Sequence, residues 1–232
     1  MAEVNKKLAV FDVDGTIFRS SLLIKLVDAL IEDGLFKPSV AKVYAQAQAM
    51  WLDREGDYEA YIAAVIKVFD ANIKGVAYKD FRRVAYGVVA KEKGHTYRFT
   101  RELVKELKKD GYYILAISHS PKLAVEAFCK TLGFSKVYGL MYEVERKKFR
   151  FTGNILFREI IFQKDKILSR AVEKLGLSLK GSVGVGDTES DIAFLSVVDR
   201  PICFNPNQKL YDHALRKGWE VVVERKDVVY KI

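Results

Sequence analysis

The chain has 232 residues, of which 50% are hydrophobic, and 39 basic against 30 acidic residues give it a net charge of +9. A hydrophobic share of this size can bury a full core, which argues against a disordered chain. No apolar run is long enough to span a bilayer and no signal peptide is apparent, so we expect a cytoplasmic protein. The basic residues are scattered rather than interleaved with aromatic ones, so no nucleic-acid partner is expected.

Two β-rich runs frame a long helical stretch. Residues 8–13 read LAVFDV and lead into the turn DGT, and residues 112–117 read YYILAI. Both patterns predict buried strands. Between them, glycines divide four amphipathic patterns that predict helices. Ser20 or Ser21 is expected to cap the first helix and Pro38 to open the second, whereas apolar residues from Tyr58 and from Phe81 mark the third and fourth. The four helices are expected to end at Gly34, Gly56, Gly75 and Gly94.

A crossover between two parallel strands needs only one helix, so the additional helices predict a separate module. We expect a helical-bundle cap at residues 19–94 and a core at residues 1–18 and 95–232. In the rest of the core, strand and helix patterns alternate, which predicts an α/β fold with a doubly wound, Rossmann-like parallel sheet. The expected elements are helices at 100–109, 122–132 and 165–175, a hairpin at 140–155 and a strand at 182–185.

Acidic residues follow two of the predicted strands. Asp12 and Asp14 end the first strand, and its two-residue period points both side chains to one side. Asp187 and Asp191 follow the strand SVGVG. Because the carboxyl ends of parallel strands meet at one edge of a sheet, we expect these acids to converge there. Converging carboxylates repel one another unless a cation lies among them, and oxygen ligands suit Mg²⁺.

A hydroxyl and an ammonium group complete this predicted edge. Ser118 directly follows the strand at 112–117, and Lys164 precedes the helix that leads to the Asp187 strand. Both groups can hold the oxygens of a phosphoryl group. His119, next to Ser118, is interpreted as a lining residue rather than a base.

The motifs together resemble the haloacid dehalogenase-like hydrolases. They are FDVDGT at 11–16, ISHSP at 117–121, Lys164, and GDTESD at 186–191. The spacing between Lys164 and Asp187 is similar to that of phosphoserine phosphatase-like members, with Lys166 as the alternative lysine. The predicted helical insertion after the first motif resembles the cap of that subgroup.

This resemblance implies a phosphatase that hydrolyses a small phosphate monoester through an aspartyl phosphate. Asp12 would be the nucleophile, and Asp14 the acid for the leaving group and then the base for water. Ser118 and Lys164 would hold the phosphoryl oxygens.

The resemblance also implies the cofactor Mg²⁺. Asp12, the backbone carbonyl of Asp14, and Asp187 would hold the ion, whereas Asp191 would orient the metal site without binding the ion itself.

Other activities fit the same motifs. A phosphotransferase or phosphomutase would keep both acids of the first motif, and a non-catalytic binding protein on this fold is a further alternative. Dehalogenase members lack an acid at the position of Asp14. Phosphoserine phosphatases place a Glu early in the first cap helix, whereas this chain has Arg19 there and no acid before Asp28. We therefore expect L-phosphoserine to be a poor substrate. The motifs predict neither the substrate nor the oligomeric state.

Overall fold

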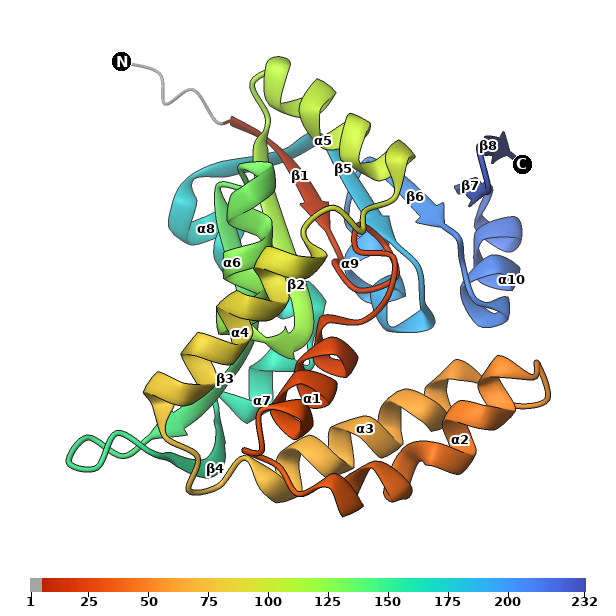
Figure 1. Cartoon of the computed structure of the whole chain (residues 1–232). Helices are drawn as coiled ribbons and strands as arrows, with labels where there is room; N and C mark the ends of the chain where they lie inside the picture. Colours follow the sequence, from red (N-terminus) through yellow and green to blue (C-terminus); the bar gives the residue numbers. More distant parts are fainter. Residues whose placement is uncertain (1–5) are drawn as a thin grey trace.

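The computed structural model describes residues 6–232, so residues 1–5 of the expected core segment lie outside the described range. Within that range the strands form one eight-stranded sheet in the order β4-β3-β2-β1-β5-β6-β7-β8 (Figure 1). The six central strands run parallel, and β4 and β8 are antiparallel edges. The predicted α/β class with a doubly wound sheet is confirmed. The strands are β1 (Lys6–Phe11), β2 (Tyr113–Pro121), β3 (Lys136–Val144), β4 (Phe151–Leu156), β5 (Leu177–Gly186), β6 (Arg200–Phe204), β7 (Glu220–Arg225) and β8 (Val228–Lys231).

Both faces of the sheet are covered by helices. Alternate residues of β1 point to opposite faces, so Ala9 and Phe11 pack with α5 and α6, whereas Leu8 and Val10 pack with α8, α9 and α10. This double burial explains why the β1 sequence is apolar at every position from Leu8 to Phe11. The core helices are α5 (Arg98–Lys109), α6 (Lys122–Leu132), α7 (Arg158–Ile161), α8 (Lys164–Leu175), α9 (Ile192–Leu195) and α10 (Gln208–Lys217).

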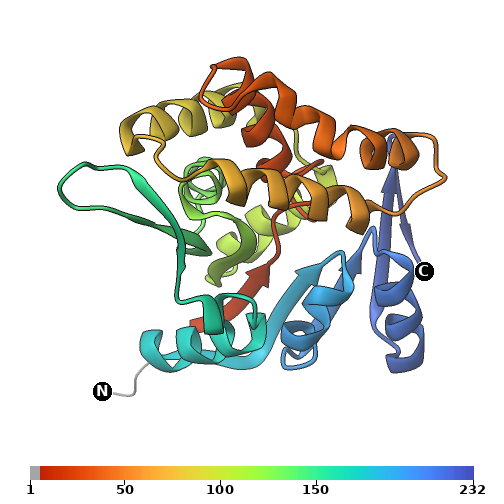
Figure 2. The same cartoon turned by 90° about the horizontal axis from the view of Figure 1, so that it is seen from below.

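Helices α1 to α4, which we call the cap, lie between β1 and α5 in the chain and share a separate apolar cluster. The side chain of Ser21 caps α1 by accepting from the backbone N–H of Leu23 at 3.2 Å. In Figure 2, α2 and α3 extend past the carboxyl ends of the strands toward α10. The cap helices are α1 (Leu22–Glu32), α2 (Lys42–Leu52) with a preceding 3₁₀ turn at Pro38–Ala41, α3 (Tyr58–Asn72) and α4 (Tyr78–Glu92).

Some predicted boundaries are wrong. Strand β2 continues to Pro121 because the polar segment after Ile117 stays extended beside β3, with a break in register. Strand β5 begins at Leu177 rather than 182, because it pairs with Lys6 and Lys7 before a register shift. Polar residues and a glycine in these segments hide the extended backbone from a hydrophobicity pattern.

The hairpin expected at 140–155 exists, but its first strand is longer and belongs to the main sheet. Strand β3 pairs in parallel with β2 from Lys136 onward before it turns back as β4. The hairpin also packs on the cap, where Tyr142 of β3 meets Phe69 with ring centroids 5.2 Å apart. The hairpin therefore joins core and cap. Among residues 6–232, no helix combines the length and apolarity that a membrane crossing requires.

Candidate active site

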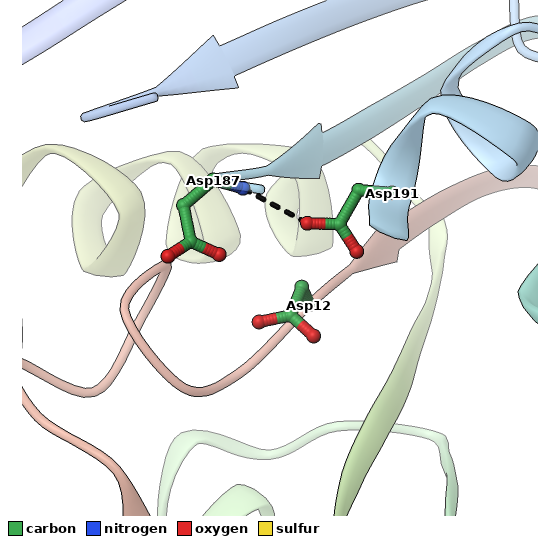
Figure 3. A group of neighbouring side chains, drawn as sticks. All are labelled: Asp12, Asp187 and Asp191. Carbon is green, nitrogen blue, oxygen red and sulfur yellow. Dashed lines mark hydrogen bonds between the residues drawn. The ribbon is translucent and has the colours of Figure 1, made fainter. Parts of the chain in front are cut away.

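The carboxylates of Asp12, Asp187 and Asp191 converge at the carboxyl ends of β1 and β5. Asp12 directly follows β1, where its backbone N–H donates to the carbonyl of Val185 at 2.9 Å. Asp187 directly follows β5. One carboxylate oxygen from each of the three acids lies within 4.8 Å of the others. Figure 3 shows the three side chains around a common space.

Lys164 lies between two of these acids. It is the first residue of α8, and its side chain is only 3% exposed. Its Nζ donates to Asp12 Oδ1 and to Asp191 Oδ1, both at 2.6 Å. The structure thus brings Lys164 to the acids, whereas Lys166 lies two residues further along α8.

Both carboxylate oxygens of Asp191 accept hydrogen bonds. Oδ1 accepts from Lys164, and Oδ2 accepts from the backbone N–H groups of Asp187 and Thr188 at 3.0 and 3.1 Å. Gly186 permits this close approach, because a Cβ on it would lie 2.6 Å from the Asp191 side chain. Asp191 therefore shapes the loop that carries Asp187.

Asp14 points to a different group of partners. Its Oδ2 accepts from Ser118 Oγ at 2.8 Å, and its Oδ1 accepts from the backbone N–H of Leu22 at 2.5 Å. Ser118 in turn accepts from the backbone N–H of Ser120 at 2.9 Å. The carboxylate of Asp14 therefore joins the end of β2 to the start of the cap.

The turn after β1 supports Asp187. Thr16 Oγ1 donates to Asp187 Oδ1 at 3.0 Å. Gly15 has a φ of +79°, and a Cβ at this position would collide with the Asp187 carboxylate. This turn therefore needs a glycine both for its backbone conformation and for the space that Asp187 occupies.

The cluster carries more negative charge than Lys164 can neutralise. Burial raises the pKa of Asp12 to about 8, and repulsion from Asp191 and Asp14 adds to this, against the opposing effect of Lys164. Burial also raises the pKa of Asp187 well above its usual range, together with repulsion from Asp12 and Asp191. Burial alone would lower the pKa of Lys164, but the two neighbouring acids raise it, so the lysine stays charged.

A divalent cation fits this donor set. Carboxylate oxygens are hard ligands, and a cation would favour the ionised forms of Asp12 and Asp187, whose pKa values are raised by burial and then by repulsion between the acids. Both carboxylates face the common space, whereas both oxygens of Asp191 already accept hydrogen bonds.

His119 lies close to this cluster without a hydrogen bond to it. Its Nε2 is buried and has no hydrogen-bond partner within residues 6–232. Its ring packs on Phe162 with centroids 5.4 Å apart. Burial, followed by the charge of Lys164, lowers the pKa of His119 to about 4. The imidazole is therefore neutral near pH 7 and lines the site.

Tyr58 is a cap residue near the site that the sequence analysis did not single out. It begins α3 and packs on Trp51 with ring centroids 5.3 Å apart. Burial raises the pKa of Tyr58, and the charges on Asp14 and Asp187 raise it further. The one signal for it in the sequence is its place directly after Asp57, the residue that caps α3.

A protein-family model matches most of this chain. The model described as haloacid dehalogenase-like hydrolase matches residues 9–196, which include the four acids, the lysine and the serine of the site.

Individual proteins that resemble this chain share a quarter of their aligned residues or fewer with it. A phosphoserine phosphatase from Archaeoglobus fulgidus is 25% identical over 90% of this chain, and the chain spans 55% of that protein's length. A histidinol-phosphatase from Neisseria meningitidis is 24% identical over 94% of this chain and 98% of its own length. A solved structure of an aspartyl-phosphate intermediate analogue of phosphoserine phosphatase covers 96% of this chain and 95% of its own, with 20% identity and a TM-score of 0.61.

Proposed function

This chain belongs to the haloacid dehalogenase-like hydrolase family, and from its site we propose that it is a Mg²⁺-dependent phosphatase acting through a phosphorylated Asp12. The observation that carries the proposal is the group formed by buried Asp12 and Lys164 with half-buried Asp187, and with Asp14 beside it at the same sheet edge. Such a group can receive a phosphate dianion only with added positive charge.

In the proposed first step, an oxygen of Asp12 attacks phosphorus as the bond to the leaving oxygen breaks. Asp14 gives its proton to that oxygen. Burial raises the pKa of Asp14 above its usual range, which supports a carboxyl that can carry a proton. Ser118 Oγ and Lys164 Nζ lie beside Asp14 and Asp12 respectively, where they can donate to phosphoryl oxygens.

In the second step, Asp14 takes a proton from water, whose oxygen attacks phosphorus and releases Asp12. Asp12, Asp187 and the backbone carbonyl of Asp14 would hold Mg²⁺, which supplies positive charge for the phosphoryl oxygens. Asp191 would keep the Asp187 loop and Lys164 in place through the hydrogen bonds on both of its oxygens.

Rapid-quench labelling with p-nitrophenyl phosphate and Mg²⁺ tests this mechanism. The leaving group of this substrate needs no proton, so Asp14→Asn should still form a phosphoenzyme and then hydrolyse it about a hundredfold more slowly or worse. Asp12→Asn should form none. Excess chelator should abolish turnover of the unchanged protein. A phosphoryl label found on Ser118 or any residue other than Asp12 would contradict the mechanism.

For the substrate, we propose a small phosphate monoester whose leaving group lacks a free ammonium next to the phosphate. The names of the relatives suggest phosphoserine and histidinol phosphate as the first compounds to test. The first turn of α1 carries no acid, and Asp28 is already the acceptor for Tyr44 at 3.0 Å. A panel of phosphorylated metabolites should therefore rank L-phosphoserine low, and histidinol phosphate with it, because both carry an ammonium on the carbon next to the phosphate-bearing one. The same panel with an added acceptor alcohol would expose a phosphotransferase by its transfer product.

A further inference from the structure

Lys209 connects the cap to the loop that carries Asp187. It is the second residue of α10, and its Nζ lies 2.7 Å from Glu189 Oε1 and 3.1 Å from Glu59 Oε2. Glu59 is the second residue of cap helix α3, and Glu189 lies two residues after Asp187. One ammonium group therefore links two segments that are far apart in the sequence.

The core side of this link is well supported. Asn207 caps α10 by accepting from the backbone N–H of Leu210 at 3.0 Å, and its side chain also donates to Glu189. The backbone N–H of Asn207 donates to the carbonyl of Asp187 at 2.9 Å. The start of α10 and the Asp187 loop therefore form one hydrogen-bonded unit, and Lys209 projects from it toward the cap.

The cap side of the link lies over the proposed phosphate site. Glu59 contacts Lys209, whose second partner, Glu189, lies two residues after Asp187. Figure 2 shows α3 passing the carboxyl ends of the central strands. The start of α3 therefore lies beside the loop that carries Asp187.

The two ends of α3 are held by different interactions. Near its C-terminal end, Asp70 accepts from Tyr142 Oη of the hairpin at 2.8 Å. In the turn that follows, backbone hydrogen bonds of 2.8 to 3.0 Å join residues 75–78 to residues 149–151 of the hairpin. At its N-terminal end, α3 is linked to α10 by the side chains of Glu59 and Lys209, which are 71% and 64% exposed. Figure 2 shows the hairpin and α10 at opposite ends of the cap.

We propose that Lys209 is a positioning residue that holds the first turn of α3 over the phosphate site, so that the cap opens at this end while the hairpin retains the other. The proposal rests on the proposed phosphatase function. If the closed cap binds substrate better than the open one, a smaller closed fraction raises the apparent KM in proportion. Surface ion pairs are weak, so the expected rise is about two- to fivefold, with kcat within about twofold.

The kinetic test uses p-nitrophenyl phosphate with Mg²⁺ and the full chain. Lys209→Met and Glu59→Gln should each raise KM, and the double variant should raise it no further than Lys209→Met, because both remove the same link. Lys209→Arg keeps the positive charge, so its KM should stay close to that of the unchanged protein. Lys217→Met, an exposed change at the other end of α10, is the matched control and should leave KM unchanged. An unchanged KM in Lys209→Met would overturn the proposal.

The dependence of KM on salt concentration provides a second kinetic test. Because the link is exposed, raising NaCl from low to about 0.5 M should screen it and bring the KM of the unchanged protein toward that of Lys209→Met. At each salt concentration, the KM of Lys209→Met is divided by the KM of the unchanged protein. This ratio cancels the effect of salt on the substrate itself. A ratio that does not fall with salt would contradict an electrostatic link.

Hydrogen exchange provides a readout that does not need activity. Without substrate, the amides of residues 59–64 in Lys209→Met should exchange about two- to fivefold faster than in the unchanged protein, whereas those of residues 70–78 should not. Lys217→Met should change neither segment. If the chain proves inactive, this experiment still tests the link, so failure of the proposed function and failure of the link can be told apart. Equal exchange at residues 59–64 in both proteins would show that Lys209 does not hold the cap.

Discussion

Lys164 and Lys209 each lie between two carboxylates, but Lys164 is inside the protein and Lys209 is at its surface. Lys164 is 3% exposed and contacts Asp12 and Asp191, whereas Lys209 is 64% exposed and contacts Glu59 and Glu189. The chemical groups are alike, but their surroundings differ. Water screens the outer pair of contacts and can replace either of them, whereas the inner acids have no such substitute. Burial, rather than contact geometry, decides how much each lysine matters.

The inner arrangement is therefore costly to disturb, and the outer one can open. A buried lysine that must neutralise buried acids suits a rigid site for a phosphoryl group, because its charge and position change little before reaction. An exposed lysine between core and cap suits a contact that breaks whenever substrate enters. The same substitution at the two positions tests this difference directly.

The largest effect is expected for Lys164→Met. Removing one partner of a buried ion pair leaves unpaired charge, which costs about 3–5 kcal/mol of the free energy of unfolding. The loss should be greater at pH 8 than at pH 5, because at pH 8 the acids ionise freely in the unfolded chain, whereas burial without the lysine opposes their ionisation in the folded protein. Urea unfolding in chelator at both pH values measures it, with Lys209→Met as the matched control. A loss below about 1 kcal/mol at pH 8 would show that the buried acids do not depend on Lys164.

An intermediate effect is expected at His119, because a protonated His119 would be a second buried cation beside Lys164. Because its pKa is lowered to about 4, the unfolded chain binds the proton more readily than the folded one. The stability tied to neutral His119 is present above about pH 6.5 and is lost as the pH falls toward 4. His119→Gln should remove up to about 3 kcal/mol of this acid sensitivity.

Urea unfolding of both proteins at several pH values checks the His119 prediction. His95→Gln is the matched control, because His95 is 66% exposed and pairs with Glu92 at 2.7 Å. A difference between the unchanged protein and His119→Gln that stays constant from pH 7 to pH 4 would contradict the prediction.

The smallest effect on stability is expected for Lys209→Met. Its contacts are exposed, so the melting temperature should change by less than about 2 °C even though KM rises. Differential scanning calorimetry at low and high salt measures this. A large drop in melting temperature at low salt would mean that the link supports the fold itself, and the contrast between the two lysines would then be wrong.

Sequence patterns alone were sufficient for the fold class and the family. The glycine-bounded apolar stripes predicted four cap helices because an amphipathic helix needs one apolar face and a stop signal, both of which are local. The expected helix at 122–132 matches α6 residue for residue. The acids Asp12, Asp14 and Asp187 could be placed at one sheet edge because parallel strands end together. Their roles in catalysis and metal binding, like the domain limits at 18 and 95, remain proposals.

Tertiary structure alone decided which groups touch. Spacing could not show that Lys164 bridges Asp12 and Asp191, since these residues lie 152 and 27 positions apart from it. The hairpin contact with the cap and the Lys209 link were equally invisible, because neither exposed charges nor a Tyr in a strand specify a distant partner. A local pattern reports the face that a residue presents, whereas the partner it meets depends on how the whole sheet and cap pack together.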